Sequence, residues 1–126
     1  MRTIIQIEFS DNILREREAI LRNLGFNVIS IRGAAGFARE DFFGQSVAAV
    51  VIGHGAPVEE RQRLALCVRN QLPESPIVAL LRRSDTFLTD VNANCPADNP
   101  VLWVRTLNEI TTLVPRPIDE IKRPIG

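Results

Sequence analysis

The chain has 126 residues and a mass of 14.1 kDa, which is the size of one domain. Hydrophobic residues make up 45%, which argues against a disordered chain. Fifteen Lys and Arg residues balance fifteen Asp and Glu residues, and this zero net charge gives no pull toward nucleic acid or an anionic membrane surface. With two cysteines and one histidine, the sequence predicts neither a disulfide framework nor a four-ligand zinc site. We see no membrane span or signal peptide in the sequence and expect a cytoplasmic protein.

The first 31 residues predict a strand, a helix and a second strand. Residues 3–9 are short and rich in β-branched side chains, as in a buried strand. Ser10 or Asp11 should cap a helix that ends at Gly25, and residues 26–31 form the next strand. The helix carries an apolar stripe in which one charged residue, Arg17, is the exception.

The middle of the chain predicts a loop at 33–36 and a short helix at 37–43. Residues 47–52, Val-Ala-Ala-Val-Val-Ile, contain no charge and favour a central parallel strand buried on both faces. A tight loop at 53–57 and a helix at 58–72 follow. Within this helix, Cys67 is expected to be a small core residue.

The last third has a weaker pattern. Residues 77–81 predict a fourth strand, residues 87–91 a short helix, and residues 101–104 a fifth strand. We expect irregular structure between 95 and 100, with Cys95 as the more exposed thiol, and a final helix near 107–113. Three prolines exclude a continuous helix in the tail, so we divide the chain into a domain at 1–113 and a tail or linker at 114–126.

Five alternations of strand and helix predict a parallel sheet with helices on both faces. Ligands of such sheets bind at the carboxyl ends of the strands. The residues that follow the strands therefore carry the functional information: residues 8–11, residues 53–57, residues 82–85 and Arg105.

Several segments resemble the receiver domain of two-component response regulators, a family of signalling domains. They are Ile4-Ile5-Gln6-Ile7-Glu8, the Leu24-Gly25-Phe26 turn, Val50-Val51-Ile52-Gly53 with Pro57, Ser75-Pro76-Ile77-Val78-Ala79-Leu80, and Ala97-Asp98. The resemblance extends from residue 1 to about residue 113. It implies an α/β, flavodoxin-like three-layer sandwich with a five-stranded parallel sheet in the order 2-1-3-4-5, in a cytoplasmic bacterial protein.

The chemistry of that family depends on residues that this sequence mostly lacks. Two acidic residues after the first strand hold magnesium in the family, and here Glu8 and Phe9 fall at those positions. Gly53 falls where an aspartate accepts the phosphoryl group, and Leu81 falls where a hydroxyl is expected. The family also has a lysine after its fifth strand, where Arg105 is the nearest cation here. The resemblance therefore implies a degenerate receiver, with a pocket formed by Glu8, Phe9, Gly53, His54, Leu81 and Arg105.

Without an acceptor, the chain is expected to be a non-catalytic, non-phosphorylatable signalling domain that needs no cofactor and acts through protein contacts. The family pairs through the face of its fourth helix, fifth strand and fifth helix. The corresponding residues here are Phe87, Val101, Trp103, Arg105 and Glu109, with Trp103 as a possible anchor or a plain core residue. The expected partner is another protein or a second copy of the chain, and this domain is not expected to bind nucleic acid or membrane.

Other interpretations remain open at the level of sequence. The chain could be a small-ligand-binding module of the flavodoxin type, although Ser10-Asp11-Asn12 is a poor phosphate loop. It could be an enzyme that uses Glu8, His54 and Ser84, provided that these groups come within hydrogen-bond distance. Glu8 with Asp11 could hold a cation, but the pair lacks a third ligand. His54 could be phosphorylated or bind metal, or it could be an ordinary loop residue between two glycines.

Overall fold

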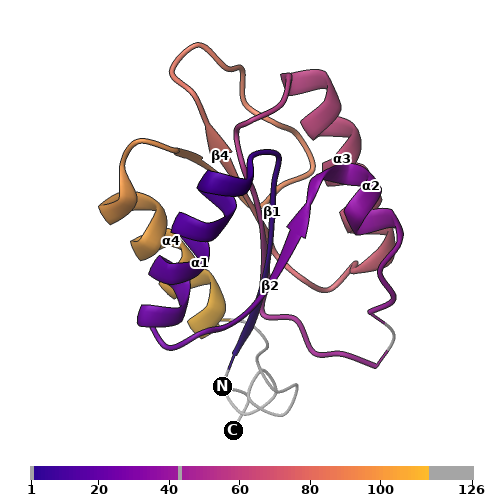
Figure 1. Cartoon of the computed structure of the whole chain (residues 1–126), viewed down its shortest axis with the longest axis vertical. Coiled ribbons are helices and arrows are strands. Elements are labelled where there is room, and N and C mark those ends of the chain that lie inside the picture. The colour runs from indigo at the N-terminus through magenta and orange to yellow at the C-terminus, as the bar shows by residue number, and fades with distance from the viewer. Residues whose placement is uncertain (1, 43, 114–126) are drawn as a thin grey trace, which may run out of the picture.

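The structure is a computed structural model, and it describes residues 2–42 and 44–113. Figure 1 shows the arrangement of its helices and strands. In chain order these are β1 Thr3–Glu8, α1 Asp11–Asn23, β2 Asn27–Arg32, α2 Gly33–Ala38, β3 Ala49–Ile52, α3 Val58–Gln71, β4 Ile77–Leu81, β5 Ala93–Pro96 and α4 Pro100–Leu113. The expected tail at 114–126 lies outside the described residues.

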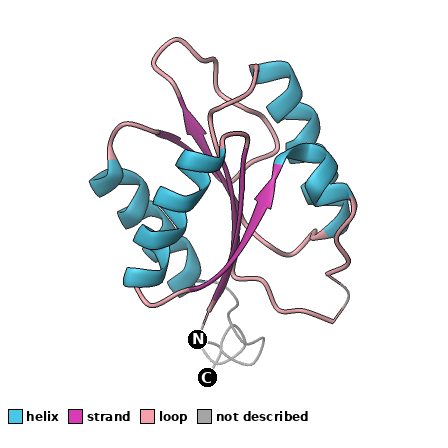
Figure 2. Ribbon diagram, viewed as in Figure 1, coloured by secondary structure: helices cyan, strands magenta, loops and turns pink. Residues whose placement is uncertain are grey.

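The five strands form one parallel sheet in the order β2-β1-β3-β4-β5, which confirms the expected order. Helices α1 and α4 cover one face and α2 and α3 cover the other, so the molecule has three layers (Figures 1 and 2). All strands run the same way, and their carboxyl ends therefore meet at the same edge of the sheet, at the top of Figure 1.

The two middle strands are the centre of the core. All four residues of β3 are buried, as the uncharged run of the sequence predicts. Alternate side chains of β1 and β3 point to opposite layers: Ile4 and Val51 pack toward α1 and α4, whereas Ile5 and Val50 pack toward α2 and α3. Apolar burial on both faces stabilises this part of the sheet.

The first helix begins and ends where the sequence predicts. Ser10 is the N-cap residue, although its side chain makes no capping hydrogen bond. Gly25 has a φ of +93°, a left-handed conformation that terminates a helix and that residues other than glycine adopt only with strain. The chain then turns directly into β2.

The predicted position of the second helix is wrong. The structure has a helix at Gly33–Ala38 instead of a loop at 33–36 and a helix at 37–43. Its last turn buries Phe37, whose ring stacks on Phe42 at a centroid distance of 5.3 Å. The segment Gly33–Ala38 consists mostly of small residues and has no periodic apolar stripe of its own. We infer that contact of the two rings with the sheet stabilises this helix.

The predicted fifth strand is also wrong. Residues 101–104 belong to α4, and the edge strand is Ala93–Pro96, in the stretch expected to be irregular. A helix signal was present, because Asn99 precedes Pro100 and its side-chain oxygen accepts a hydrogen bond from the backbone N–H of Leu102 at 3.1 Å. An apolar run that begins with Pro after a capping Asn therefore indicates a helix more strongly than a strand.

Between β4 and β5 the chain forms a loop instead of the predicted helix at 87–91. Side chains from other elements hold this loop in place. Gln62 of α3 exchanges two hydrogen bonds with the backbone of Thr89, and Asn94 of β5 does the same with Leu88. Leu88 is buried against Ala79 and Leu81, and it covers the sheet where a helix was expected.

The two cysteines exchange their predicted environments: Cys67 is exposed and Cys95 is buried. Cys95 lies in β5 and contributes to the cluster that contains Trp103, so a strand position accounts for its burial. Among the residues that the structure describes, no helix has the length and apolar character needed to cross a membrane.

Candidate functional site

Glu8 is the centre of the site at the carboxyl end of the sheet. It is the last residue of β1 and is fully buried. Its carboxylate accepts hydrogen bonds from the backbone N–H groups of Phe9 at 2.9 Å and Gly55 at 3.1 Å. The guanidinium of Arg17 donates a third bond at 2.6 Å. A buried carboxylate is stable only when it is paired and hydrogen-bonded, and Glu8 meets both conditions.

Gly53 is the residue that makes room for Glu8. It follows β3 directly, and its backbone N–H donates to the carbonyl of Ile7 at 2.7 Å. A Cβ atom at position 53 would lie only 1.8 Å from Oε2 of Glu8. The Glu8 carboxylate thus occupies the space into which any side chain at position 53 would project, and the two neighbouring strand ends are complementary in shape.

Arg17 links this carboxylate to the helix layer that α1 and α4 form. It lies on α1, and its side chain is only 7% exposed. Its guanidinium carbon lies 5.8 Å from the centre of the Trp103 ring on α4, a cation–π geometry. The charged exception in the apolar stripe of the first helix is therefore the counter-ion of Glu8. An isolated charge within such a stripe was the sequence signal for it.

His54 lies beside this pair, between two glycines. Its Nδ1 is 3.8 Å from Oε2 of Glu8, too far for a hydrogen bond, and this buried nitrogen has no hydrogen-bond partner. Burial lowers the pKa of His54, the charge of Glu8 raises it, and the charges of Arg17, Arg82 and Arg61 lower it further. The net result is a pKa below the ordinary value, which favours the neutral imidazole.

The remaining residues of the predicted pocket divide into two groups. Phe9 is partly buried against the α2–α3 layer, and Leu81 is buried at the end of β4. Arg105 does not reach the site: it lies exposed on α4, because the segment assigned to a fifth strand is helical. The strand that does end here is β5, and it closes with Cys95 and Pro96, followed by Ala97. The structure thus joins Glu8, Phe9, Gly53, His54 and Leu81 and excludes Arg105.

A second buried ion pair was not predicted as such. Arg61 of α3 is fully buried and donates to the carbonyls of Ala56 at 2.7 Å and Leu80 at 3.2 Å. Its third contact is a 2.7 Å bond to the carboxylate of Asp85, in the loop after β4. Asp85 also accepts the backbone N–H of Arg82 at 2.8 Å. Arg61 thereby ties the loops after β3 and β4 together.

The pKa of Asp85 reflects two opposing effects. Burial raises the pKa of this carboxyl, whereas the hydrogen bonds from the Arg82 backbone and the Arg61 side chain, with the charges of both arginines, lower it. The hydrogen bonds and charges prevail, and the pKa lies below its ordinary value. Asp85 is therefore a permanent anion at neutral pH.

The two acidic residues considered for a cation site each face an arginine. Glu8 pairs with Arg17, and Asp11 forms an exposed ion pair with Arg32 at 2.7 Å. Within residues 2–42 and 44–113, no group of three or more His, Cys, Asp or Glu residues is arranged to hold a metal ion. Both carboxylates thus have a cationic partner in the protein itself.

Of the residues expected to make protein contacts, one is buried in the core and the others are exposed. Trp103 is 2% exposed and belongs to the core between α1 and α4. Phe87 and Val101 are 74% and 71% exposed, the former in the loop before β5 and the latter at the start of α4. Arg105 and Glu109 are exposed on α4. Of the two roles considered for Trp103, the structure supports core packing.

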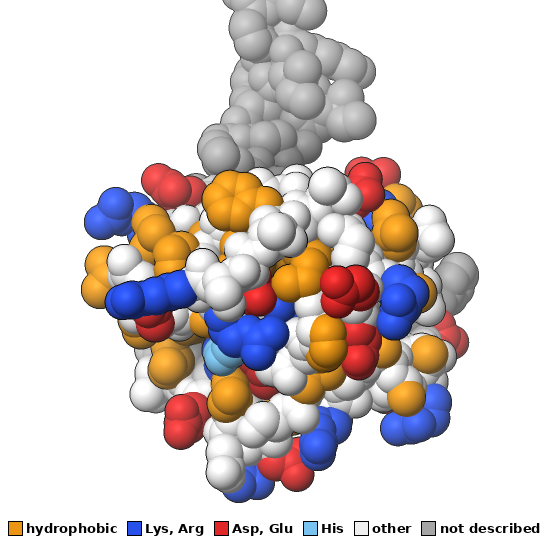
Figure 3. Space-filling view, turned by 90° about the horizontal axis from the view of Figure 1, so that it is seen from above, with side chains coloured by type: hydrophobic (Ala, Val, Ile, Leu, Met, Phe, Trp, Pro, Cys, Tyr) orange, Lys and Arg blue, Asp and Glu red, His pale blue; other side chains and the backbone are white. Residues whose placement is uncertain are grey.

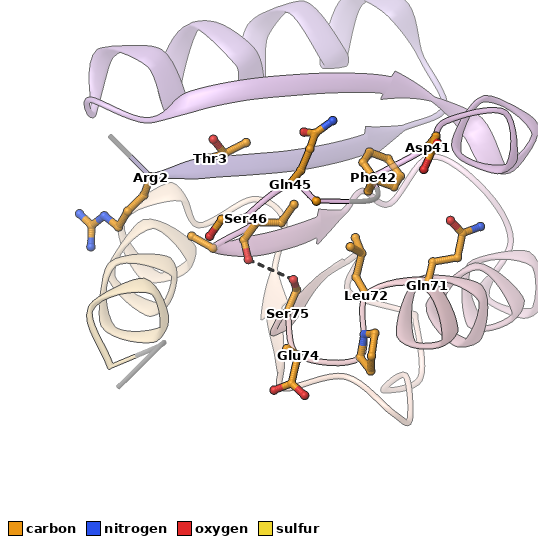
Figure 4. A pocket seen from close by; sticks show the side chains of 14 residues that line it. Arg2, Thr3, Asp41, Phe42, Gln45, Ser46, Gln71, Leu72, Glu74 and Ser75 are labelled. Atoms are coloured by element: carbon orange, nitrogen blue, oxygen red, sulfur yellow. Dashed lines mark hydrogen bonds between the residues drawn. The ribbon is translucent and has the colours of Figure 1, made fainter. Parts of the chain in front are cut away.

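A cavity also lies at the opposite, amino end of the sheet. It has a volume of about 950 Å³, and Figure 4 shows side chains from the starts of the strands and the turn after α3 around it. The hydroxyl of Ser75 donates there to the carbonyl of Val47 at 3.0 Å. Its lining residues are Arg2, Thr3, Asp41, Phe42, Gly44, Gln45, Ser46, Val47, Ala48, Gln71, Leu72, Pro73, Glu74 and Ser75. It contains no residue of the site around Glu8.

Comparison with known proteins gives matches of structure only. No protein-family model matches the sequence, and no curated protein matches it. A solved receiver domain of a signal transduction histidine kinase from Syntrophus aciditrophicus has a TM-score of 0.74 at 16% identity, covering 93% of this chain and 95% of that one. The response regulator TrrA from Thermotoga maritima, solved with Mg²⁺ and BeF, has a TM-score of 0.72 at 16% identity, covering 87% and 99%.

A third match broadens the range of proteins with this architecture. It is an adenylate cyclase from Rhodopirellula baltica, with a TM-score of 0.74 at 13% identity over 88% of this chain and 87% of that one. Identities this low establish the fold without the function. The five-stranded parallel sheet in the order 2-1-3-4-5, with helices on both faces, gives this chain the fold of response regulator receiver domains.

Proposed function

We propose that the chain is a receiver-like signalling domain that does not accept a phosphoryl group and acts through protein contacts. The observation that carries the proposal is the carboxylate of Glu8 in the space beside Gly53. Position 53 offers no nucleophile, and Oε2 of Glu8 would lie 1.8 Å from a Cβ placed there. Phosphoryl transfer needs an exposed nucleophile and nearby cations to neutralise charge. Glu8 is fully buried and bonded to Arg17, so it cannot take over the role of the missing aspartate.

The experiment is intact-mass measurement after incubation with acetyl phosphate and magnesium. We expect an unchanged mass for this chain and a gain of one phosphoryl group for a competent receiver treated in parallel. The Gly53→Asp variant should also remain unmodified. Its new carboxylate would occupy the same space as the Glu8 carboxylate, and both would depend on the Arg17 guanidinium for neutralisation. A phosphoryl group mapped to any residue of this site in the unaltered chain would overturn the proposal.

The contact surface that we propose lies on both sides of the edge strand β5. Phe87 and Val101 expose most of their side chains there, and Arg105 and Glu109 are exposed on the adjoining helix α4. Exposed apolar side chains combined with charged ones are typical of protein interfaces. The zero net charge removes long-range repulsion between copies, and Arg105 of one copy can face Glu109 of another across a two-fold axis.

Sedimentation equilibrium of the chain tests this surface with a second copy as the partner. We expect self-association that is lost in Phe87→Ser combined with Val101→Ser. Ile20→Ser is the matched control, because Ile20 is 37% exposed on α1, the helix that packs over β1 and β2. A chain that remains monomeric at high micromolar concentration, or a control that dissociates equally, would overturn the homodimer.

The enzyme alternative receives no support from the geometry. A general base needs a hydrogen bond to its nucleophile or to a bound substrate. Glu8 is fully buried and paired with Arg17, and Ser84 is exposed without a hydrogen bond to His54. The small-ligand alternative is different, because a cavity lies next to His54.

A further inference from the structure

A small cavity opens beside the filled acceptor position. Its volume is about 240 Å³, and it lies where β4 and β5 end. The lining residues are His54, Leu81, Arg82, Arg83, Ala97 and Asp98. Leu81 and Ala97 provide apolar walls, whereas the remaining four side chains are polar or charged. A cavity of this size holds a small ion or one end of a larger molecule, and not a drug-sized ligand.

The two arginines of this cavity have donors to spare. Nε of Arg82 is 3.5 Å from Asp85, and its second contact, to the carbonyl of Ala56, is 3.4 Å long. Arg83 is 93% exposed, with Asp98 at 3.4 Å. These distances are at the long end for hydrogen bonds between charged groups. Each guanidinium has five N–H donors, so both can bind a ligand without first breaking a strong bond.

The charges around His54 come from every element packed against it. Glu8 approaches from β1, Arg17 from α1, Arg61 from α3, Arg82, Arg83 and Asp85 from the loop after β4, and Asp98 from the turn after β5. Four arginines thus face three carboxylates, and one positive charge is in excess while the imidazole is neutral. Figure 3 shows the pale-blue imidazole of the chain's single His next to blue side chains on this face.

We propose that this cavity binds a tetrahedral dianion without covalent chemistry, and that His54 takes up a proton when the anion binds. Nδ1 is the imidazole nitrogen near Glu8, so protonation gives one N–H toward that carboxylate and leaves Nε2–H for the ligand. Sulfate and a phosphate group share the necessary charge and shape, and arginine binds such oxygens through paired N–H donors. The inference rests on the proposed function, because it assigns to the same site a bound anion in place of a transferred phosphoryl group.

Linkage makes the proposal quantitative. Burial is the main cause of the lowered pKa of His54, and the charges of Arg17, Arg82 and Arg61 lower it further. A bound anion adds negative charge beside the imidazole, so the bound state must have a higher His54 pKa than the free state. By reciprocity, affinity must rise as the pH falls, by up to about tenfold for each pH unit between the His54 pKa of the bound state and the lower pKa of the free state, and it must be independent of pH above both values. Asp98 opposes the ligand, and Arg83 lies next to it to offset that charge.

Nuclear magnetic resonance offers a direct test, because the chain has one histidine and hence one imidazole signal. The pH titration of His54 is recorded with increasing sulfate, an ion that does not titrate itself in this range, at ionic strength kept constant with chloride. We expect the His54 pKa to rise with sulfate. Arg82→Gln should weaken binding about tenfold, the loss of one charge-assisted hydrogen bond. His54→Gln should bind more weakly and lose the pH dependence.

Arg63→Gln is the matched control, because Arg63 is exposed on α3 and does not line the cavity. It removes the same charge as Arg82→Gln and should leave sulfate affinity unchanged. A second experiment repeats the titration with inorganic phosphate and with glycerol phosphate. Tighter binding of inorganic phosphate indicates a site for the free ion, and tighter binding of glycerol phosphate indicates a site for the phosphate group of a small metabolite.

An unchanged His54 pKa in sulfate would overturn the inference. Equal weakening by Arg63→Gln and Arg82→Gln would overturn it as well, because it would indicate general attraction without a site. Either result leaves the proposed function intact, since sulfate transfers no phosphoryl group. A phosphorylated chain in the mass measurement would overturn the proposed function irrespective of sulfate binding.

Discussion

Arg17 and Arg61 are both buried at the carboxyl end of the sheet, but they act in different ways. Arg17 neutralises one carboxylate, Glu8, which occupies the space beside Gly53. Arg61 donates hydrogen bonds to two backbone carbonyls as well as to Asp85. It thereby holds the loop between β4 and β5, where the sequence predicts a short helix. The comparison shows that a buried arginine can either compensate a single charge in a site or organise backbone that lacks regular hydrogen bonds.

The largest effect should follow from Arg61→Met. The substitution leaves the buried Asp85 carboxylate and the carbonyls of Ala56 and Leu80 without their donor. Removing one partner of a buried ion pair costs about 3–5 kcal/mol in free energy of unfolding, which urea denaturation measures. Arg63→Met on the exposed side of the same helix should cost less than about 0.5 kcal/mol. Similar values for the two variants would show that Arg61 does not organise the loop.

Trp103→Ala should have the next largest effect. The ring is 2% exposed and lies against Arg17 between α1 and α4, so truncation leaves a cavity. We expect a loss of about 3–4 kcal/mol, within the range for large aromatic core residues. Val101→Ala on the same helix should have almost no effect on stability, because its side chain is 71% exposed. A Trp103→Ala variant with an unchanged urea midpoint would contradict the core assignment.

Gly53→Ala tests whether Glu8 fills the space beside position 53. The added methyl group overlaps with Oε2 of Glu8, and overpacking of this kind costs about 1–3 kcal/mol in unfolding free energy. The penalty should shrink when Glu8→Ala is also present, because the obstructing carboxylate is then gone. A double-mutant cycle measured by urea unfolding gives this coupling directly. Additive effects would mean that the two residues do not share one space.

The smallest effect should be a pH dependence from His54. Its pKa in the folded chain lies below the ordinary value of 6.5, so the unfolded chain binds the proton first as the pH falls. The contribution of His54 to stability is therefore complete above pH 6.5 and decreases as the pH falls below that value. Urea midpoints across this range should show the decrease, and His54→Gln should remove it. An increase in stability on acidification would contradict the lowered pKa.

The sequence was sufficient for the first four strands and for α1 and α3, because their signals are local. Uncharged β-branched runs predict β1 and β3, and a left-handed glycine ends α1. Beyond β4 the predicted short helix and the predicted fifth strand are wrong, because the apolar content of a segment does not by itself distinguish a strand from a helix. The run at 101–104 is apolar enough for a strand, but the Asn99 cap and Pro100 make it the start of α4.

The candidate site was predicted in part for the same reason. Glu8, Gly53 and His54 follow strands that the sequence placed correctly, and their proximity follows from the parallel order. Arg105 was placed wrongly because its position depended on the misassigned fifth strand. Arg61 gave no signal, because it is one of three arginines in a helix of mixed composition, and arginines are ordinarily solvated.

The sequence by itself determined the parallel α/β fold class and the absence of a nucleophile at position 53, because these follow from local pattern and residue identity. The strand order was implied by the resemblance to receiver domains, and the strand pairing confirms it. Only the tertiary structure decided what fills the resulting space. The Glu8 carboxylate lies there because Gly53 leaves it room and because Arg17, nine residues along the chain and on a different element, supplies the opposite charge. Such pairing depends on distances between elements, and a buried charge persists only where those distances allow its compensation.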